Sequence, residues 1–111
     1  QVKAMIAEGQ IEIASVGFMR GRTLNNAFVV IDEAQNCTYV QIKMLLTRLG
    51  WNSTMIVTGD PAQSDLLPEL SGLAPAAARL ESMGASDVAV VRLQQADVVR
   101  HPLVGKMLDV L

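Results

Sequence analysis

Short apolar runs recur along this chain, and their spacing predicts alternating strands and helices. The run at residues 28–31 (Phe-Val-Val-Ile) has no polar alternation, which predicts a strand covered on both faces, as in a parallel sheet. Residues 54–58 and 88–93 form two further apolar runs that we expect to be strands. Residues 10–16 alternate apolar and polar side chains, as a half-exposed strand does, and a turn-rich connector follows at 17–26.

Residues 38–49 have the periodicity of an amphipathic helix. Thr38 suits the N-cap position, and Gln41 three residues later would complete a capping box. Gly50 comes directly after the periodic stretch and is a suitable stop. The apolar face is expected to carry Val40, Met44 and Leu45, with Leu49 further along.

Two later helices are expected at 74–83 and 102–111, since each has a proline that suits a first helical turn. Gly84 is the expected end of the earlier one, and the stretch 65–73 before it is loop-like. The alternation of strands and helices favours an α/β domain with a parallel sheet and covering helices.

The composition fits one packed domain of 111 residues, because half of them are hydrophobic and 18% are charged. No apolar run reaches the roughly 18 residues that cross a bilayer, so we expect no membrane contact. Cys37 is the single cysteine, which excludes an internal disulfide and favours a cytoplasmic setting. The net charge of −2 argues against bulk attraction to nucleic acid, although Arg20 and Arg22 could still form a local basic patch.

Two adjacent carboxylates, Asp32 and Glu33, follow the buried run at 28–31. Open α/β sheets bind ligands at the carboxyl ends of their strands. In a P-loop NTPase such a pair would be the Walker B motif, in which the first acid holds Mg²⁺ and the second prepares the attacking water. The alternative is an acidic pair placed only to complement a helix dipole.

Two later residues could complete a phosphate site. Gln63 follows the second strand in the stretch Thr-Gly-Asp-Pro-Ala-Gln, where it could hydrogen-bond a γ-phosphate. Arg100 lies between the third expected strand and the last helix, where it could stabilise charge on a transferring phosphoryl group. A solvated turn glutamine and a surface arginine are the simpler alternatives.

The combination of four segments closely resembles the PhoH family, phosphate-starvation-inducible ATPases related to superfamily-one helicases. These segments occur in the family's order and spacing, and the resemblance runs from about Ile11 to the C-terminus. They read Met-Arg-Gly-Arg-Thr-Leu-Asn at 19–25, Phe-Val-Val-Ile-Asp-Glu-Ala-Gln-Asn at 28–36, Thr-Gly-Asp at 58–60 and Asp-Val-Val-Arg-His-Pro-Leu-Val at 97–104.

The resemblance implies a three-layer, RecA-like P-loop NTPase fold that binds ATP and Mg²⁺. By that resemblance Asp32 holds the metal, Glu33 prepares the water, Gln63 matches a helicase-type Gly-Asp-x-x-Gln glutamine and Arg100 matches a late arginine. Arg20 and Arg22 would contact a phosphate of the nucleotide or of a nucleic acid. RNA and a second copy of the chain stay open as partners.

One family element, the Walker A loop Gly-x-x-x-x-Gly-Lys-Ser/Thr, has no match in this sequence; Gly105-Lys106-Met107 does not fit it. The resemblance therefore implies the carboxyl-side part of the domain, residues 1–111, without its first strand, phosphate loop and first helix. We expect this stretch alone to be inactive, and to self-associate or be marginally stable because apolar edges near Val30 and Ile56 would be exposed.

Two other classes of function remain open from the residues. The chain could be a module that binds nucleic acid or protein, with nucleotide playing little part. It could also be a metal-dependent nuclease built on Asp32, Glu33, Asp60 and Asp65, since two-metal sites use clustered carboxylates.

Overall fold

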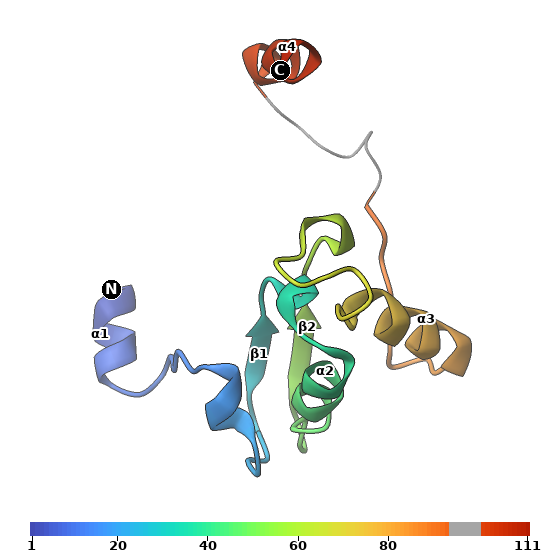
Figure 1. The fold of residues 1–111 in the computed structure, drawn as a ribbon. Coiled ribbons are helices and arrows are strands. Elements are labelled where there is room, and N and C mark those ends of the chain that lie inside the picture. The colour runs from blue at the N-terminus through green and yellow to red at the C-terminus, as the bar shows by residue number, and fades with distance from the viewer. Residues whose placement is uncertain (94–100) are drawn as a thin grey trace.

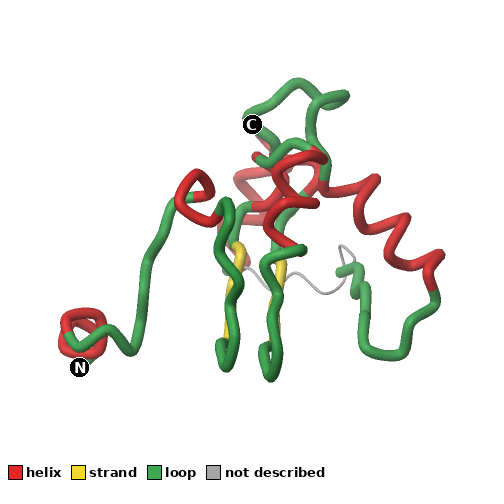
Figure 2. Tube along the Cα trace, turned by 90° about the horizontal axis from the view of Figure 1, so that it is seen from below, coloured by secondary structure: helices red, strands yellow, loops and turns green. Residues whose placement is uncertain are grey.

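The fold is built around a parallel pair of strands. The computed structural model describes residues 1–93 and 101–111 (Figure 1). Strand β1 (Phe28–Ile31) pairs with β2 (Thr54–Val57), with Phe28 opposite Thr54 and Ile31 opposite Val57. Seen from below, the two strands run side by side (Figure 2). The two apolar runs that predicted these strands are therefore confirmed, and so is their parallel order.

Helices lie near both ends of the chain, in the connection from β1 to β2 and after β2. The α-helices are α1 (Val2–Ala7), α2 (Tyr39–Leu46), α3 (Leu73–Met83) and α4 (Pro102–Val110). The 3₁₀ turns are η1 (Val16–Met19), η2 (Ala34–Asn36) and η3 (Pro61–Gln63). Within residues 1–93 and 101–111, every helix is too short or too polar to cross a bilayer.

The predicted start of α2 is confirmed, but its predicted end is wrong. The Thr38 hydroxyl accepts from the backbone N–H of Gln41, whose side chain accepts from the N–H of Thr38, so the capping box is complete. The helix ends at Leu46 rather than at residue 49. The Thr47 hydroxyl and the Arg48 guanidinium bind carbonyls of the last turn, which satisfies groups that a longer helix would have bonded.

Helices α3 and α4 begin and end close to their predicted limits. The C-cap of α3 is Gly84, whose φ of 67° is the left-handed conformation that glycine favours. The N-cap of α4 is His101, whose Nδ1 accepts from the N–H of Leu103 at 3.1 Å. The single histidine of the sequence therefore caps a helix.

Two predicted strands are wrong. Residues 10–16 form a turn, an extended stretch and the start of η1, and residues 88–93 have no regular structure. A strand is stable only when a neighbouring strand bonds its backbone groups, so an apolar pattern alone does not form one. Val91 and Leu93 are 80% and 81% exposed, which shows that the third apolar run is not part of the core.

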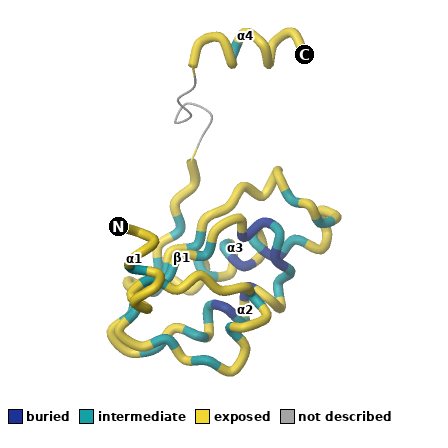
Figure 3. Tube along the Cα trace, turned by 90° about the vertical axis from the view of Figure 1, so that its left-hand side faces the viewer, coloured by how far each residue is buried: buried dark blue, intermediate teal, exposed yellow. Residues whose placement is uncertain are grey.

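One face of the sheet is covered and the other is open. Ile31 packs against a buried cluster centred on α2, whereas Phe28 and Val30 on the opposite face are 69% and 59% exposed. The buried parts of the chain gather near α2 and α3 (Figure 3). We predicted that both faces of the sheet are covered, but within the described residues only one face is. The cluster consists of Cys37, Ile42, Leu45 and Ala76.

The predicted inner face of α2 was also partly wrong, because Val40 is 71% exposed whereas Ile42 and Leu45 are buried. Helix α3 packs beside α2 and contributes Ala76 to the cluster. Arg79 of α3 lies 4.9 Å from the ring centre of Tyr39 and donates to its hydroxyl at 2.8 Å. This packing fixes α3 and the loop before it next to η2.

Candidate functional site

The carboxyl ends of β1 and β2 are joined by side chains. The Thr58 hydroxyl, one residue beyond β2, donates to Oδ1 of Asp32, one residue beyond β1, at 2.9 Å. The N–H of Thr58 donates to the carbonyl of Ile31 at 2.8 Å, which continues the ladder to this point. Asp32 and Thr58 are both exposed, so the joined strand ends face solvent.

Glu33 has an unusual backbone conformation. Its φ of 54° and ψ of 41° are left-handed, a region that residues other than glycine rarely adopt. Its N–H donates to Oδ1 of Asp32 at 2.9 Å, and the next N–H, of Ala34, donates to the carbonyl of Thr58 at 2.9 Å. Such a conformation persists where neighbouring contacts enforce it, and it is frequent at functional sites.

The loop after β2 lies against the loop after β1. The N–H of Asp60 donates to the side-chain Oε1 of Gln35 at 3.0 Å, and the Ser64 hydroxyl donates to the Gln35 carbonyl at 2.8 Å. Between these two anchors lies η3, which ends at Gln63. The loop after β1 and the loop after β2 therefore lie next to each other. That the Gln63 side chain points toward Asp32 and Glu33 stays a prediction.

Gly59 allows this close approach. A Cβ atom at Gly59 would lie 2.6 Å from Oε1 of Gln35, 2.8 Å from a methyl carbon of Leu73 and 3.0 Å from the Gln35 nitrogen. With contacts this short, the Gln35 or Leu73 side chain or the loop itself would have to shift. Glycine therefore fits the position between Thr58 and Asp60 without displacing a neighbour.

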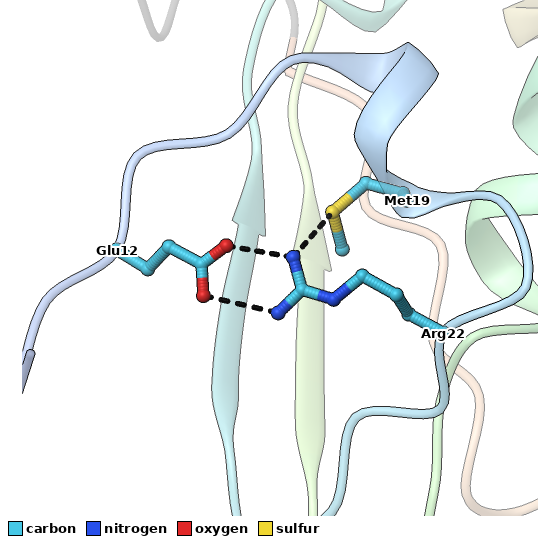
Figure 4. Close-up of polar contacts among 3 residues, drawn as sticks. All are labelled: Glu12, Met19 and Arg22. Atoms are coloured by element: carbon cyan, nitrogen blue, oxygen red, sulfur yellow. Dashed lines mark hydrogen bonds and ion pairs between the residues drawn. The ribbon is translucent and has the colours of Figure 1, made fainter.

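Arg22 is held by a carboxylate. Its guanidinium binds both oxygens of Glu12, at 2.6 and 3.0 Å, and approaches the sulfur of Met19 (Figure 4). The hydrogen bond from Arg22, and then its charge, lowers the pKa of Glu12, and the same contacts raise the pKa of Arg22. A phosphate would have to displace Glu12 to reach Arg22, whereas Arg20 is exposed.

The remaining predicted residues contribute less to the site. Arg100 lies outside the described residues. Cys37 is buried, and burial raises the pKa of its thiol, so it is a poor nucleophile. Among residues 1–93 and 101–111, no three His, Cys, Asp or Glu side chains are grouped to hold a metal ion, which argues against the nuclease built on four carboxylates.

Two residues that contribute to the site were given no role by the sequence. Thr58 binds Asp32, and Gln35 links the loops on both sides. Gln35 is a polar residue that follows the acidic pair after Ala34, yet it is only 2% exposed. The segment Asp-Glu-Ala-Gln at 32–35 could have indicated this role. The side-chain amide of a glutamine can donate to a nearby carboxylate and accept from the backbone of a second loop.

These features define part of a parallel α/β protein that presents an acidic loop at the carboxyl edge of its sheet. Comparison with known proteins gives the family: a model described as PhoH-like protein matches residues 1–111. The chain therefore belongs to the PhoH-like family.

Relatives from three bacteria agree with this assignment. A PhoH-like protein of Synechocystis is 51% identical over 110 residues, which are 98% of this chain and 33% of that protein. A PhoH-like protein of Bacillus subtilis is 51% identical over 106 residues, 95% of this chain and 33% of that protein. Protein PhoH of Escherichia coli is 48% identical over 101 residues, 90% of this chain and 28% of that protein. The chain thus spans about a third of the length of these curated relatives.

Proposed function

We propose that this chain supplies the Walker B part of an ATP-hydrolysing P-loop domain. The observation that carries the proposal is the pair of exposed carboxylates at the carboxyl end of β1, joined to the end of β2 by the hydrogen bond from Thr58 to Asp32. Parallel α/β sheets bind nucleotides at this edge. The family assignment supports the same role, because PhoH-like proteins are generally P-loop ATPases.

Asp32 suits a magnesium ligand. Mg²⁺ in nucleotide sites is bound by one or two carboxylates together with phosphate oxygens and water, so a larger cluster of acids is not needed. The bonds to Oδ1 of Asp32 from Thr58 and from the Glu33 N–H fix the orientation of this carboxylate. When bound, the ion would neutralise charge on the β- and γ-phosphates.

Glu33 would orient a water molecule and accept its proton as the water oxygen bonds to the γ-phosphorus and the bond to the β-phosphate oxygen breaks. Gln63 would hydrogen-bond the γ-phosphate, and Arg100 would stabilise charge on the transferring phosphoryl group. Arg20 is the better placed of the two early arginines for a phosphate contact, since Glu12 binds Arg22. RNA is proposed only as a stimulating partner, and a second copy of the chain as a possible neighbour.

Substitution of Glu33 in the full-length protein tests the proposal. Glu33→Gln removes the base and keeps the shape, so ATP hydrolysis should fall by at least about 100-fold while ATP binding is retained. Glu8→Gln makes the same chemical change at an exposed position after α1 and should leave both unchanged. Hydrolysis at the unsubstituted rate in Glu33→Gln would refute the assignment. RNA binding that is indifferent to ATP would favour the binding-module alternative.

A further inference from the structure

Gln35 is a polar residue buried where three segments meet. Its side chain lies between the loop after β1 and the loop after β2, and only 2% of its surface is exposed. Its backbone carbonyl accepts from the hydroxyls of Ser64 and Ser71, each at 2.8 Å. The residue is thus anchored by its backbone, independently of what its amide group does.

The two ends of the amide bind different partners. Nε2 donates to Oε2 of Glu33, and Oε1 accepts from the N–H of Asp60 at 3.0 Å. A single planar group therefore connects the Glu33 carboxylate to the Gly59–Asp60 backbone. A glutamine can do this because its amide is at once a donor and an acceptor, whereas an ionised carboxylate of the same shape only accepts.

This connection restrains a side chain that is otherwise exposed. Glu33 has a left-handed backbone and faces solvent, so its carboxylate gains a fixed direction only from a specific partner. Gln35 supplies that partner from a buried position, and Gly59 leaves room for the contact because it has no Cβ. The same loop leads through Asp60 to Gln63.

We propose that Gln35 is a positioning residue that holds the carboxylate of Glu33 and ties it to the loop that carries Gln63. The inference rests on the proposed ATPase function. It adds that the position of the Glu33 carboxylate depends on the buried amide of Gln35. The same amide joins Glu33 to the loop after β2 by hydrogen bonds. Gln35 itself does not contact the reacting atoms.

Two substitutions in the full-length protein test this link by steady-state ATPase kinetics and thermal melting. Gln35→Glu keeps the shape and the acceptor for Asp60 but removes the donor for Glu33. Gln35→Met keeps the approximate volume and removes both bonds. Ser71→Ala is the matched control, since it removes a hydrogen bond to the Gln35 carbonyl and leaves the amide contacts in place.

Both Gln35 variants should lower kcat by about 10- to 100-fold, the effect of a small displacement of a catalytic group, with KM for ATP changed by less than about threefold. Ser71→Ala should keep kcat within about twofold of the unsubstituted protein. The kcat of Gln35→Glu relative to the unsubstituted protein should rise as pH falls, because the introduced carboxyl donates again once protonated. The other ionisable side chains on the two linked loops are Asp32, Glu33, Asp60 and Asp65. The unsubstituted protein, measured over the same pH range, is the reference for effects that do not come from position 35.

The outcomes separate this inference from the proposed function. Normal kcat in Gln35→Met, combined with lost hydrolysis in Glu33→Gln, would overturn the positioning role alone. Normal hydrolysis in Glu33→Gln would overturn the proposed function itself. Equal losses of kcat in Ser71→Ala and the Gln35 variants, or unfolding of both Gln35 variants, would show that Gln35 supports the fold rather than the base.

Discussion

The hydroxyl of Thr58 donates a 2.9 Å hydrogen bond to the carboxylate of Asp32, which joins the ends of two strands that are 26 residues apart in the sequence. This contact orients the residue that we propose to hold Mg²⁺. It also places the loops that follow the two strands next to each other, and those loops carry Glu33 and Gln63. The geometry of the whole site therefore depends on the pairing of β1 with β2.

Thr58→Val should weaken the apparent affinity for Mg²⁺ in ATP hydrolysis. The change is nearly isosteric and removes the hydroxyl that orients Asp32, so more Mg²⁺ should be needed for half-maximal activity. Because both residues are exposed, the free energy of unfolding should fall by only about 0.5 kcal/mol. Thr54→Val, the same change at the start of β2, is the control and should leave the magnesium titration unchanged.

Gly59→Ala should destabilise the protein and impair hydrolysis together. The new methyl group would lie 2.6 Å from Oε1 of Gln35 and must displace that side chain or the loop, which costs about 1–3 kcal/mol. Chemical denaturation and ATPase rates measure the two effects. Gly17→Ala has no neighbouring atom within 4 Å and serves as the control. Unchanged stability in Gly59→Ala would contradict the described packing.

The Glu12–Arg22 ion pair should depend on pH in a defined direction. The pKa of Glu12 is lowered in the folded protein, so the pair stabilises the fold above the unfolded-state pKa of about 4.3 and is lost as pH falls through the lower folded value. Carbon-detected NMR titration of Glu12 should show the lowered pKa. Arg22→Gln should return it to its usual value. An unchanged Glu12 titration in that variant would refute the pairing.

The isolated 111-residue chain should self-associate or melt at low temperature. Phe28 and Val30 on β1 are 69% and 59% exposed, and Ile56 on β2 is 42% exposed, so the chain presents an apolar sheet surface to water. Sedimentation at increasing concentration should reveal larger species, and Val30→Lys should reduce them. A monomer at all concentrations with a melting temperature above about 65 °C would contradict this prediction.

Local signals in the sequence predicted the elements whose stability depends on neighbouring residues. The capping box of Thr38 and Gln41 and the glycine end of α3 depend on such short-range chemistry. The two four-residue strands were also predicted from their apolar runs, and each is stable because the other lies beside it in the sheet. The failures at 10–16 and 88–93 have the opposite cause. A strand needs a partner edge that lies far away in sequence, and no pattern within the run reports whether that partner is present.

The acidic pair of the candidate site could be predicted because a strand followed by two carboxylates is a local pattern. The role of Gln35 could be predicted only in part. Its contact with Glu33 is local, whereas the Asp60 backbone and the hydroxyls of Ser64 and Ser71 meet it only in the fold. The pairing of Arg22 with Glu12 was hidden for the same reason, since the two residues are ten positions apart in the sequence and η1 lies between them.

The most direct test of the central claim is a crystal structure of the full-length protein with Mg²⁺ and a non-hydrolysable ATP analogue. The account predicts that the terminal phosphate lies at the carboxyl end of β1, with Mg²⁺ bound to Asp32 directly or through one water and the carboxylate of Glu33 facing the γ-phosphorus. A nucleotide bound away from this edge, with Asp32 and Glu33 contacting neither metal nor phosphate, would contradict it.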